Sequence, residues 1–94
     1  MKAQWNNTII AESDATVIIE GNHYFPKESI KMEYLKESHT QSSCPWKGCA
    51  SYYNIIVNGE THEDAAWYYA EPSPLTSNIK NHIAFWEGVE ITSE

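Results

Sequence analysis

The sequence predicts an all-β fold, a small single domain of mostly antiparallel short strands with one or two short helical turns. The strongest indication is the run 50–57, which is rich in the β-branched and aromatic residues that suit a half-buried strand. The dipeptide Asn58-Gly59 follows it and is typical of a two-residue β-hairpin turn. Turn-forming residues also recur at short intervals along the whole chain, so no long helix is expected.

The N-terminal part of the chain is expected to form short strands separated by turns. Asn6-Asn7, the segment 13–15 and Gly21-Asn22 carry the residue types that favour turns. Val17 and Ile19 alternate with their neighbours, as in a strand that buries one face. The predicted strands in this part are residues 2–5, 8–12, 16–20 and 23–25.

The segment 26–38 supports two interpretations. Pro26 suits a first helical position and the residues after it are good helix formers, so local propensity alone favours an amphipathic helix. The whole-chain pattern described below favours one helical turn over residues 26–29, followed by a strand through Met32, Tyr34 and Leu35. We adopt the strand, because tertiary context overrides propensity.

The rest of the chain is expected to alternate between strands and short connections. The segment 38–43 is polar and predicted to be a loop. Ser73 is a plausible N-cap with Pro74 at the first helical position, and Leu75 and Ile79 share one helical face, so one short helix should end near Asn81. The remaining predicted strands are residues 60–63, 65–70, 82–86 and 89–92, with a turn or bulge at Glu87-Gly88.

The segment 40–53 is the most distinctive, because it holds both cysteines, an isolated lysine, a proline and a glycine. Pro45 fixes its own φ and biases Cys44 toward extended backbone, while Gly48 can adopt positive φ, so a tight turn is predicted. A cation such as Lys47 near a thiol favours the reactive thiolate, which makes Cys44 a candidate nucleophile. The alternative, which we expect, is a small apolar side chain buried beneath the turn.

This turn also resembles the signature of a known family. In this sequence the signature reads Cys44-Pro45-x-Lys47-Gly48-x-Ala50-x-Tyr52. Further matching pieces, in the expected order, are Ala11-x-Ser13, Glu20, Tyr24-Phe25-Pro26, Trp67-x-Tyr69 with Pro72, and Ile83-Ala84-Phe85. The chain is therefore similar, over nearly its whole length, to domain of unknown function 427, which is also labelled nucleotidyltransferase-like. The resemblance implies one compact, mainly antiparallel β-domain over residues 1–94, with a tent-like, Mss4-like sheet arrangement and no established activity. Cys49 departs from the family pattern.

Composition excludes several classes of function. The net charge is −7, and all six basic residues are lysines dispersed among acids, whereas nucleic acids need clustered basic residues. The chain has no apolar run long enough to span a membrane and no signal-peptide core at its start, so a cytoplasmic protein is expected. The two cysteines are spaced as C-x4-C and no paired ligands accompany them, so neither a metal site nor another cofactor is predicted.

Two classes of function remain. The first is a small-molecule site, catalytic or not, in which Lys47 holds an anionic group, Cys44 acts on the ligand and aromatic side chains form the walls. The competing interpretation places at least half of those aromatics in the core. The catalytic candidates are Cys44 and Lys47, and the ligand-binding candidates are Glu20, Tyr52, Tyr53, Trp67 and Tyr69.

The second class is a non-enzymatic protein-interaction module, either a monomer or a homodimer that pairs through exposed strand edges. A nucleotidyltransferase is disfavoured, because Asp14 and Asp64 are the only aspartates and no Asp-x-Asp pair is present to hold Mg²⁺. The chain also lacks a glycine-rich phosphate loop.

Overall fold

The structure is a computed structural model, and it describes residues 1–93 of the chain. Over those residues it contains nine β-strands and three short 3₁₀ helices, so the all-β prediction is confirmed. The elements are β1 (Lys2–Trp5), β2 (Thr8–Glu12), β3 (Val17–Ile19), β4 (Asn22–Pro26), η1 (Lys27–Ser29), η2 (Met32–Tyr34), β5 (Leu35–Cys44), β6 (Gly48–Val57), β7 (Glu60–Tyr68), η3 (Pro74–Ile79), β8 (His82–Phe85) and β9 (Glu90–Thr92).

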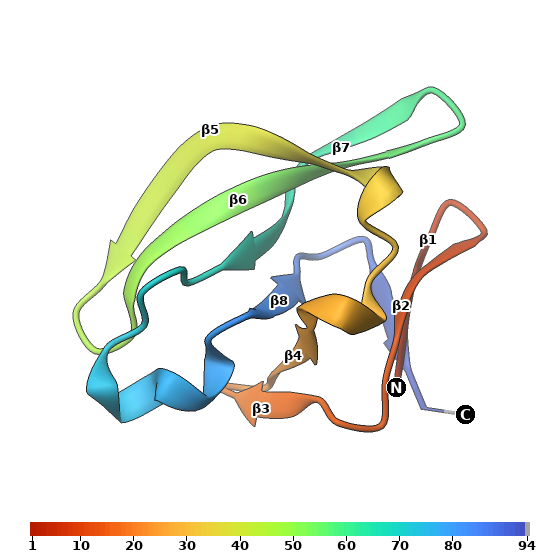
Figure 1. The fold of residues 1–94 in the computed structure, drawn as a ribbon. Coiled ribbons are helices and arrows are strands. Elements are labelled where there is room, and N and C mark those ends of the chain that lie inside the picture. Colours follow the sequence, from red (N-terminus) through yellow and green to blue (C-terminus); the bar gives the residue numbers. More distant parts are fainter. Residues whose placement is uncertain (94) are drawn as a thin grey trace.

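The strands form two antiparallel sheets. The small sheet has the order β2-β1-β9, and the large sheet has the order β3-β4-β8-β7-β6-β5. Figure 1 shows the long, curved strands β5, β6 and β7 on one side of the large sheet and the short strands β3, β4 and β8 on the other. The two halves join where Trp67 of β7 lies opposite Ala84 of β8.

Two-residue turns with positive φ close three of the hairpins. Asn58-Gly59, with φ values of 52° and 78°, confirms the predicted turn between β6 and β7. Asn6-Asn7 closes the β1–β2 hairpin in the same way. Between β3 and β4 the turn residues are Glu20-Gly21, one position earlier than predicted, because Asn22 already pairs with Ile19.

The segment after β4 forms neither the long helix nor the full strand. One helical turn, η1, is present as predicted, but Met32–Tyr34 forms a second 3₁₀ turn and the strand begins only at Leu35. The cause is tertiary: the backbone N–H of Lys31 donates to the carbonyl of Ile10, 2.8 Å away, which ties this segment to β2. The N–H of Tyr34 then donates back to the Lys31 carbonyl and closes the turn.

The predicted loop over residues 38–43 is wrong, because β5 runs without a break from Leu35 to Cys44 and pairs with β6. Most of its residues are exposed, since β5 is an edge strand of the large sheet. It therefore carries polar residues on both faces and lacks the alternation that identifies strands from sequence. The pairing register shifts between Glu37 and Gln41.

The predicted short helix is a 3₁₀ helix that ends at Ile79 and is interrupted at Thr76, where φ is −129°. Ser73 does not cap it with its side chain; its hydroxyl donates instead to the carbonyl of Trp46. Because of the interruption, Leu75 is 79% exposed whereas Ile79 is fully buried, so the two do not share a buried face.

Each face of the large sheet carries its own apolar cluster over the inner strands. The first cluster joins this sheet to the small sheet and includes Ala3, Ile10, Phe25 and Phe85. The second lies on the opposite face and is completed by Ile79 of η3; it contains Tyr24, Ala50, Trp67, Tyr69, Ile79 and Ala84. Neighbouring residues such as Tyr24 and Phe25 alternate between the clusters, as the period of a strand requires.

No helix within residues 1–93 is long and apolar enough to cross a membrane.

Candidate functional site

The turn between β5 and β6 is held in a single shape by backbone contacts. The N–H of Lys47 donates to the carbonyl of Cys44, 3.2 Å away, and the carbonyl of Lys47 accepts from the N–H of Ser73 at 3.0 Å. Gly48 has a φ of +110°, and a Cβ there would lie 3.1 Å from the carbonyl oxygen of Glu71. A side chain at this position would therefore be strained and crowded, which explains the glycine.

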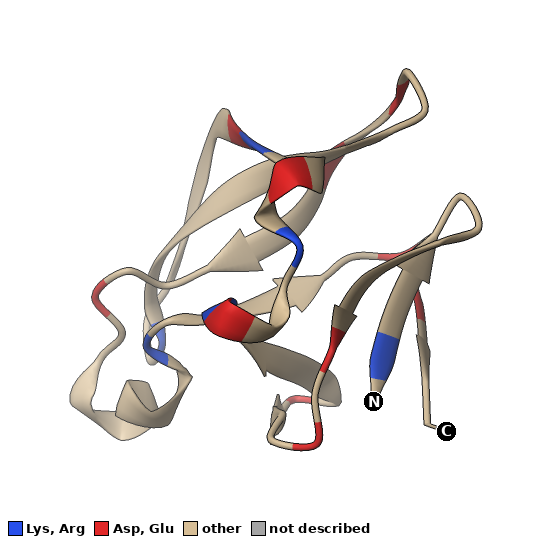
Figure 2. Cartoon of the chain, turned by 45° about the vertical axis from the view of Figure 1, so that its right-hand side comes forward, with Lys and Arg blue, Asp and Glu red and all other residues tan. Residues whose placement is uncertain are grey.

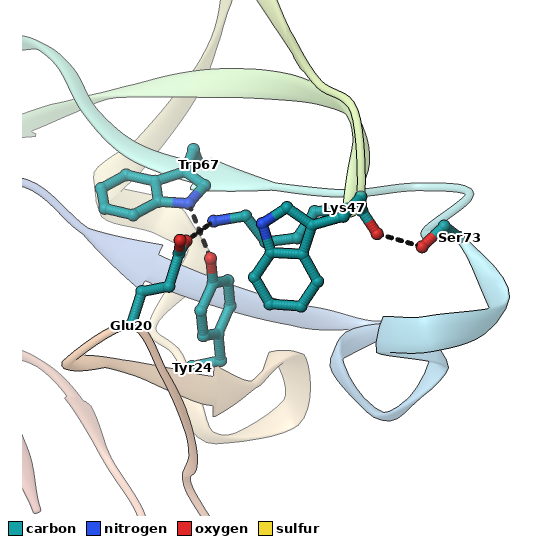
Figure 3. A network of polar contacts seen from close by, with 6 residues as sticks. Glu20, Tyr24, Lys47, Trp67 and Ser73 are labelled. Atoms are coloured by element: carbon teal, nitrogen blue, oxygen red, sulfur yellow. Dashed lines mark hydrogen bonds and ion pairs between the residues drawn. The ribbon is translucent and has the colours of Figure 1, made fainter.

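Lys47 points back across the sheet from this turn. Its side chain is only 9% exposed, and its Nζ forms an ion pair and a hydrogen bond with Glu20 of the β3–β4 turn, as Figure 3 shows. Nζ also lies 5.5 Å from the ring centroid of Trp46 and 5.7 Å from that of Tyr69, within range of cation–π attraction. The ammonium is thus enclosed by one carboxylate and two rings.

These neighbours keep Lys47 charged. Burial by itself lowers the pKa of the ammonium, but the hydrogen bond from Nζ to Glu20 and the electrostatic influence of the surrounding side chains outweigh it, and the net pKa is raised. Lys47 is therefore a fixed positive charge at neutral pH. It is also one of only two polar residues that are buried as whole residues within residues 1–93.

Glu20 occupies an unusual backbone position. Its φ of 53° lies in the left-handed region, which Asn, Asp and Gly tolerate far better than Glu. The position projects the carboxylate toward Lys47 from a different part of the sheet. The ion pair therefore ties the β3–β4 turn to the β5–β6 turn across the intervening strands.

A cavity of about 400 Å³ opens beside Lys47. Trp67 forms part of its wall, and its indole N–H donates to the hydroxyl of Tyr24 at 3.1 Å, which fixes the indole plane. Trp86, which is 54% exposed, meets Trp67 edge to face with ring centroids 5.9 Å apart. The residues lining the cavity are Thr40, Lys47, Tyr52, Glu63, Asp64, Trp67, Tyr69 and Trp86.

The carboxylate of Asp64 is held in place by hydroxyl groups from the facing edge strand. It accepts hydrogen bonds from Ser38 at 2.5 Å and from Thr40 at 2.8 Å. Asp64 has a φ of 52°, and its N–H donates to the side-chain oxygen of Asn54 at 2.9 Å, where the pairing of β6 with β7 is irregular. This β-bulge turns the Asp64 side chain toward β5 and the cavity.

The structure brings four of the predicted site residues together at this cavity: Lys47, Tyr52, Trp67 and Tyr69. Glu20 reaches the site through its ion pair with Lys47 and is not part of the cavity wall. Tyr53 lies on the opposite face of β6 from Tyr52, where it stacks on Tyr68 with ring centroids 5.1 Å apart.

Cys44 lies at the end of β5 and packs against the second cluster without lining the cavity. Both cysteines are free thiols. Cys44 lies opposite Gly48 in the hairpin register. Cys49 follows Gly48 in β6, so its side chain points to the face of the sheet opposite to that of Cys44. Within residues 1–93 no three His, Cys, Asp or Glu side chains converge in a way that would hold a metal ion.

Four lining residues were not predicted: Thr40, Glu63, Asp64 and Trp86. Their contribution depends on the pairing of β5 with β6 and of β7 with β8, and on the bulge at Asp64, none of which a local pattern reveals. The hydroxyl of Tyr52 shows the same dependence, because it is 2.8 Å from the hydroxyl of Ser42 on β5.

Figure 2 shows that the lysines lie scattered among acidic residues rather than on one element, so Lys47 is set apart by its burial.

The site combines a buried cation, flat aromatic walls and two carboxylates, a set suited to holding a small polar molecule rather than a polymer. A family model described as "Domain of unknown function (DUF427)" matches residues 1–94 of the chain. No curated protein matches the chain. The family match spans the cavity, the ion pair and both turns, and it confirms the family that the signature around Cys44 predicts.

Proposed function

Because the chain belongs to the DUF427 family, whose description assigns no activity, we propose its function from the site itself. The domain binds a small organic molecule in the cavity beside Lys47. The observation that carries this proposal is the convergence of a buried cation, aromatic walls and carboxylates on one space of about 400 Å³. Small-molecule cavities are commonly about 300–1,000 Å³, mostly apolar, with a few placed polar groups.

The chemistry of the walls indicates the class of ligand. Trp67 and Trp86 present a face and an edge at 69° to one another, an arrangement that favours a flat ring. The Lys47 ammonium has three N–H donors, and one is used by Glu20, so it can also hold an acidic or carbonyl oxygen. Glu63 and Asp64 line the same cavity, and their carboxylates can accept hydrogen bonds from N–H groups of a ligand. The ligand is thus a flat, polar molecule with an acceptor and a donor.

The arrangement supports binding more than covalent catalysis. Cys44, the one nucleophile predicted in the turn, packs against the second cluster and does not line the cavity. General acid–base chemistry would fall to Glu63 or Asp64, and Asp64 already accepts hydrogen bonds from two hydroxyl groups. We therefore assign to Glu63 and Asp64 the role of orienting a bound ligand.

Two exposed apolar side chains test the proposal. Trp86 and Leu75 are 54% and 79% exposed, but only Trp86 lines the cavity. The wild-type chain, Trp86→Ala and Leu75→Ala are screened against a collection of small heteroaromatic acids, amines and amides by thermal shift. Compounds that stabilise the wild type should stabilise Leu75→Ala equally, and their affinity for Trp86→Ala should fall by about tenfold, because one aromatic wall is lost.

A collection that gives no stabilising compound, or compounds that bind Trp86→Ala as well as wild type, would overturn the proposal. Circular dichroism of the two variants provides the control, since both side chains are partly exposed and their removal should leave the fold intact.

A second candidate function is a protein-interaction module, and the exposed apolar side chains favour it. Ile18, Trp46 and Leu75 are 61%, 39% and 79% exposed. Edge-to-edge pairing of two copies through β5 is disfavoured, because that strand carries charges and an irregular register. Light scattering distinguishes the two functions. A monomer that binds a ligand favours the small-molecule site, whereas a dimer that dissociates to monomers in Leu75→Ser favours the protein-interaction module.

A further inference from the structure

A second, smaller cavity of about 200 Å³ has a different chemical character. Lys27, Asn81 and His82 contribute to its lining together with the hydroxyl-bearing rings of Tyr53 and Tyr68. The chain has 13 acidic residues, yet none of those that the structure describes belongs to this lining. The cavity is therefore a donor-rich space within an acidic protein.

Backbone contacts hold the basic part of this cavity together. The N–H of Lys27 donates to the carbonyl of Asn81 at 2.8 Å, which joins the start of η1 to the start of β8. Asn81 has a φ of 63°, a conformation that asparagine tolerates, and its backbone turns so that His82 can enter β8. The Nδ1 atom of His82 is 2.8 Å from the Lys80 carbonyl oxygen, which can only accept, so Nδ1 is the donor and this bond fixes the imidazole ring at the cavity.

The tyrosine pair supplies hydroxyl donors. Tyr53 and Tyr68 stack at 27°, with ring centroids 5.1 Å apart, and both rings line the cavity. Burial, together with the nearby Tyr68 and Glu37, raises the pKa of Tyr53, so its hydroxyl keeps its proton. A tyrosine hydroxyl can donate that proton in a hydrogen bond to an anion. Glu37 lies opposite Tyr53 in the strand register but does not line the cavity.

We propose that this cavity is a second binding site, which takes a carboxylate or phosphate group of a small anion. An ammonium from Lys27, an amide from Asn81 and a tyrosine hydroxyl are the donors that oxyanions prefer. The cavity holds the volume of about six to seven water molecules, since each occupies about 30 Å³ in the liquid, which fits an oxyanion with a few carbon atoms. The chain's charge of −7 repels anions in general, so saturable binding here must be local.

Titration of the full, ¹⁵N-labelled chain with sodium phosphate and with sodium acetate tests the site, against sodium chloride at matched ionic strength and constant pH. We expect saturable amide shifts at residues 27, 81 and 82 with phosphate, acetate or both, and the stronger of the two identifies the favoured group. Lys27→Gln should weaken binding by about tenfold or more, because a charged donor is lost.

Three variants control for general effects. Lys31→Gln removes the same charge from an exposed position outside the lining and should leave the affinity unchanged. Asn81→Gly keeps the positive φ while removing the amide, and should weaken binding severalfold. Trp86→Ala, at the larger cavity, should have no effect, so failure of one site does not imply failure of the other. Shifts that grow linearly with either anion, or equal affinities for Lys27→Gln and Lys31→Gln, would overturn the proposal.

Discussion

Replacement of Lys47 with Met removes a buried cation while keeping most of the length of the side chain. In the native structure the ammonium meets Glu20 and the rings of Trp46 and Tyr69. Methionine is flexible and apolar and packs well against aromatic rings, so it fills the vacated volume. The loss of stability in Lys47→Met therefore reports the charge interactions rather than a new cavity.

The expected magnitude follows from the exposure of the two partners. A hydrogen bond to a charged group contributes about 1.5–3 kcal/mol, and each cation–π contact about 0.5–2 kcal/mol. Two terms reduce the sum: the variant no longer desolvates an ammonium, and the Glu20 side chain, 51% exposed, can regain water. We expect Lys47→Met to lower the free energy of unfolding by about 1–3 kcal/mol, with a coupling to Glu20→Gln of about 1 kcal/mol.

Urea unfolding, followed by tryptophan fluorescence, measures both quantities on the wild type, the two single variants and the double variant. Lys31→Met, at an exposed position, is the matched control and should change stability by less than about 0.5 kcal/mol. A coupling energy indistinguishable from zero, or a stabilised Lys47→Met, would refute the view that the ion pair ties the two turns together.

Two further predictions concern ionisation and thiol reactivity. The pKa of Tyr53 and of Tyr69 is raised chiefly by burial; burial lowers that of Lys47, but the hydrogen bond to Glu20 and the surrounding side chains together outweigh it, so the net pKa of Lys47 is also raised. The native state thus keeps protons that the unfolded chain releases above about pH 10, so stability should fall as pH rises through that range. The fall should be less steep in Tyr53→Phe. Urea midpoints that do not change with pH in that range would contradict this. Cys49 is exposed and Cys44 half-buried, so timed alkylation with mass analysis should modify Cys49 first. Faster reaction of Cys44, slowed by Lys47→Met, would instead identify an activated thiol.

The sequence was most informative where a local signal and the tertiary structure agree. Asn58-Gly59 predicts its hairpin because the backbone needs positive φ at both positions. The polar strand β5 was missed, because an edge strand exposed on both faces has no apolar alternation. Met32–Tyr34 departs from the predicted strand because long-range bonds to β2 decide its course.

The same distinction applies to the candidate site. Lys47 was identified as an isolated charge in a shaped turn, but its partner Glu20 is 27 residues away and is brought close by the strand order. Tyr53 could have been separated from Tyr52, since neighbours in a strand face opposite sides. Asp64 and Trp86 could not have been found, because a β-bulge and the pairing of distant strands bring them to the cavity.

The central claim is that the cavity beside Lys47 binds a small molecule, and the indole signals of the four tryptophans test it most directly. The strongest compound from the screen is titrated into ¹⁵N-labelled protein. We predict that the indole N–H signals of Trp67 and Trp86 shift and saturate together, while that of Trp5, which packs on His62 beside the small sheet, stays in place. Equal shifts of Trp5 and Trp86, or a response confined to residues outside the lining, would contradict the claim.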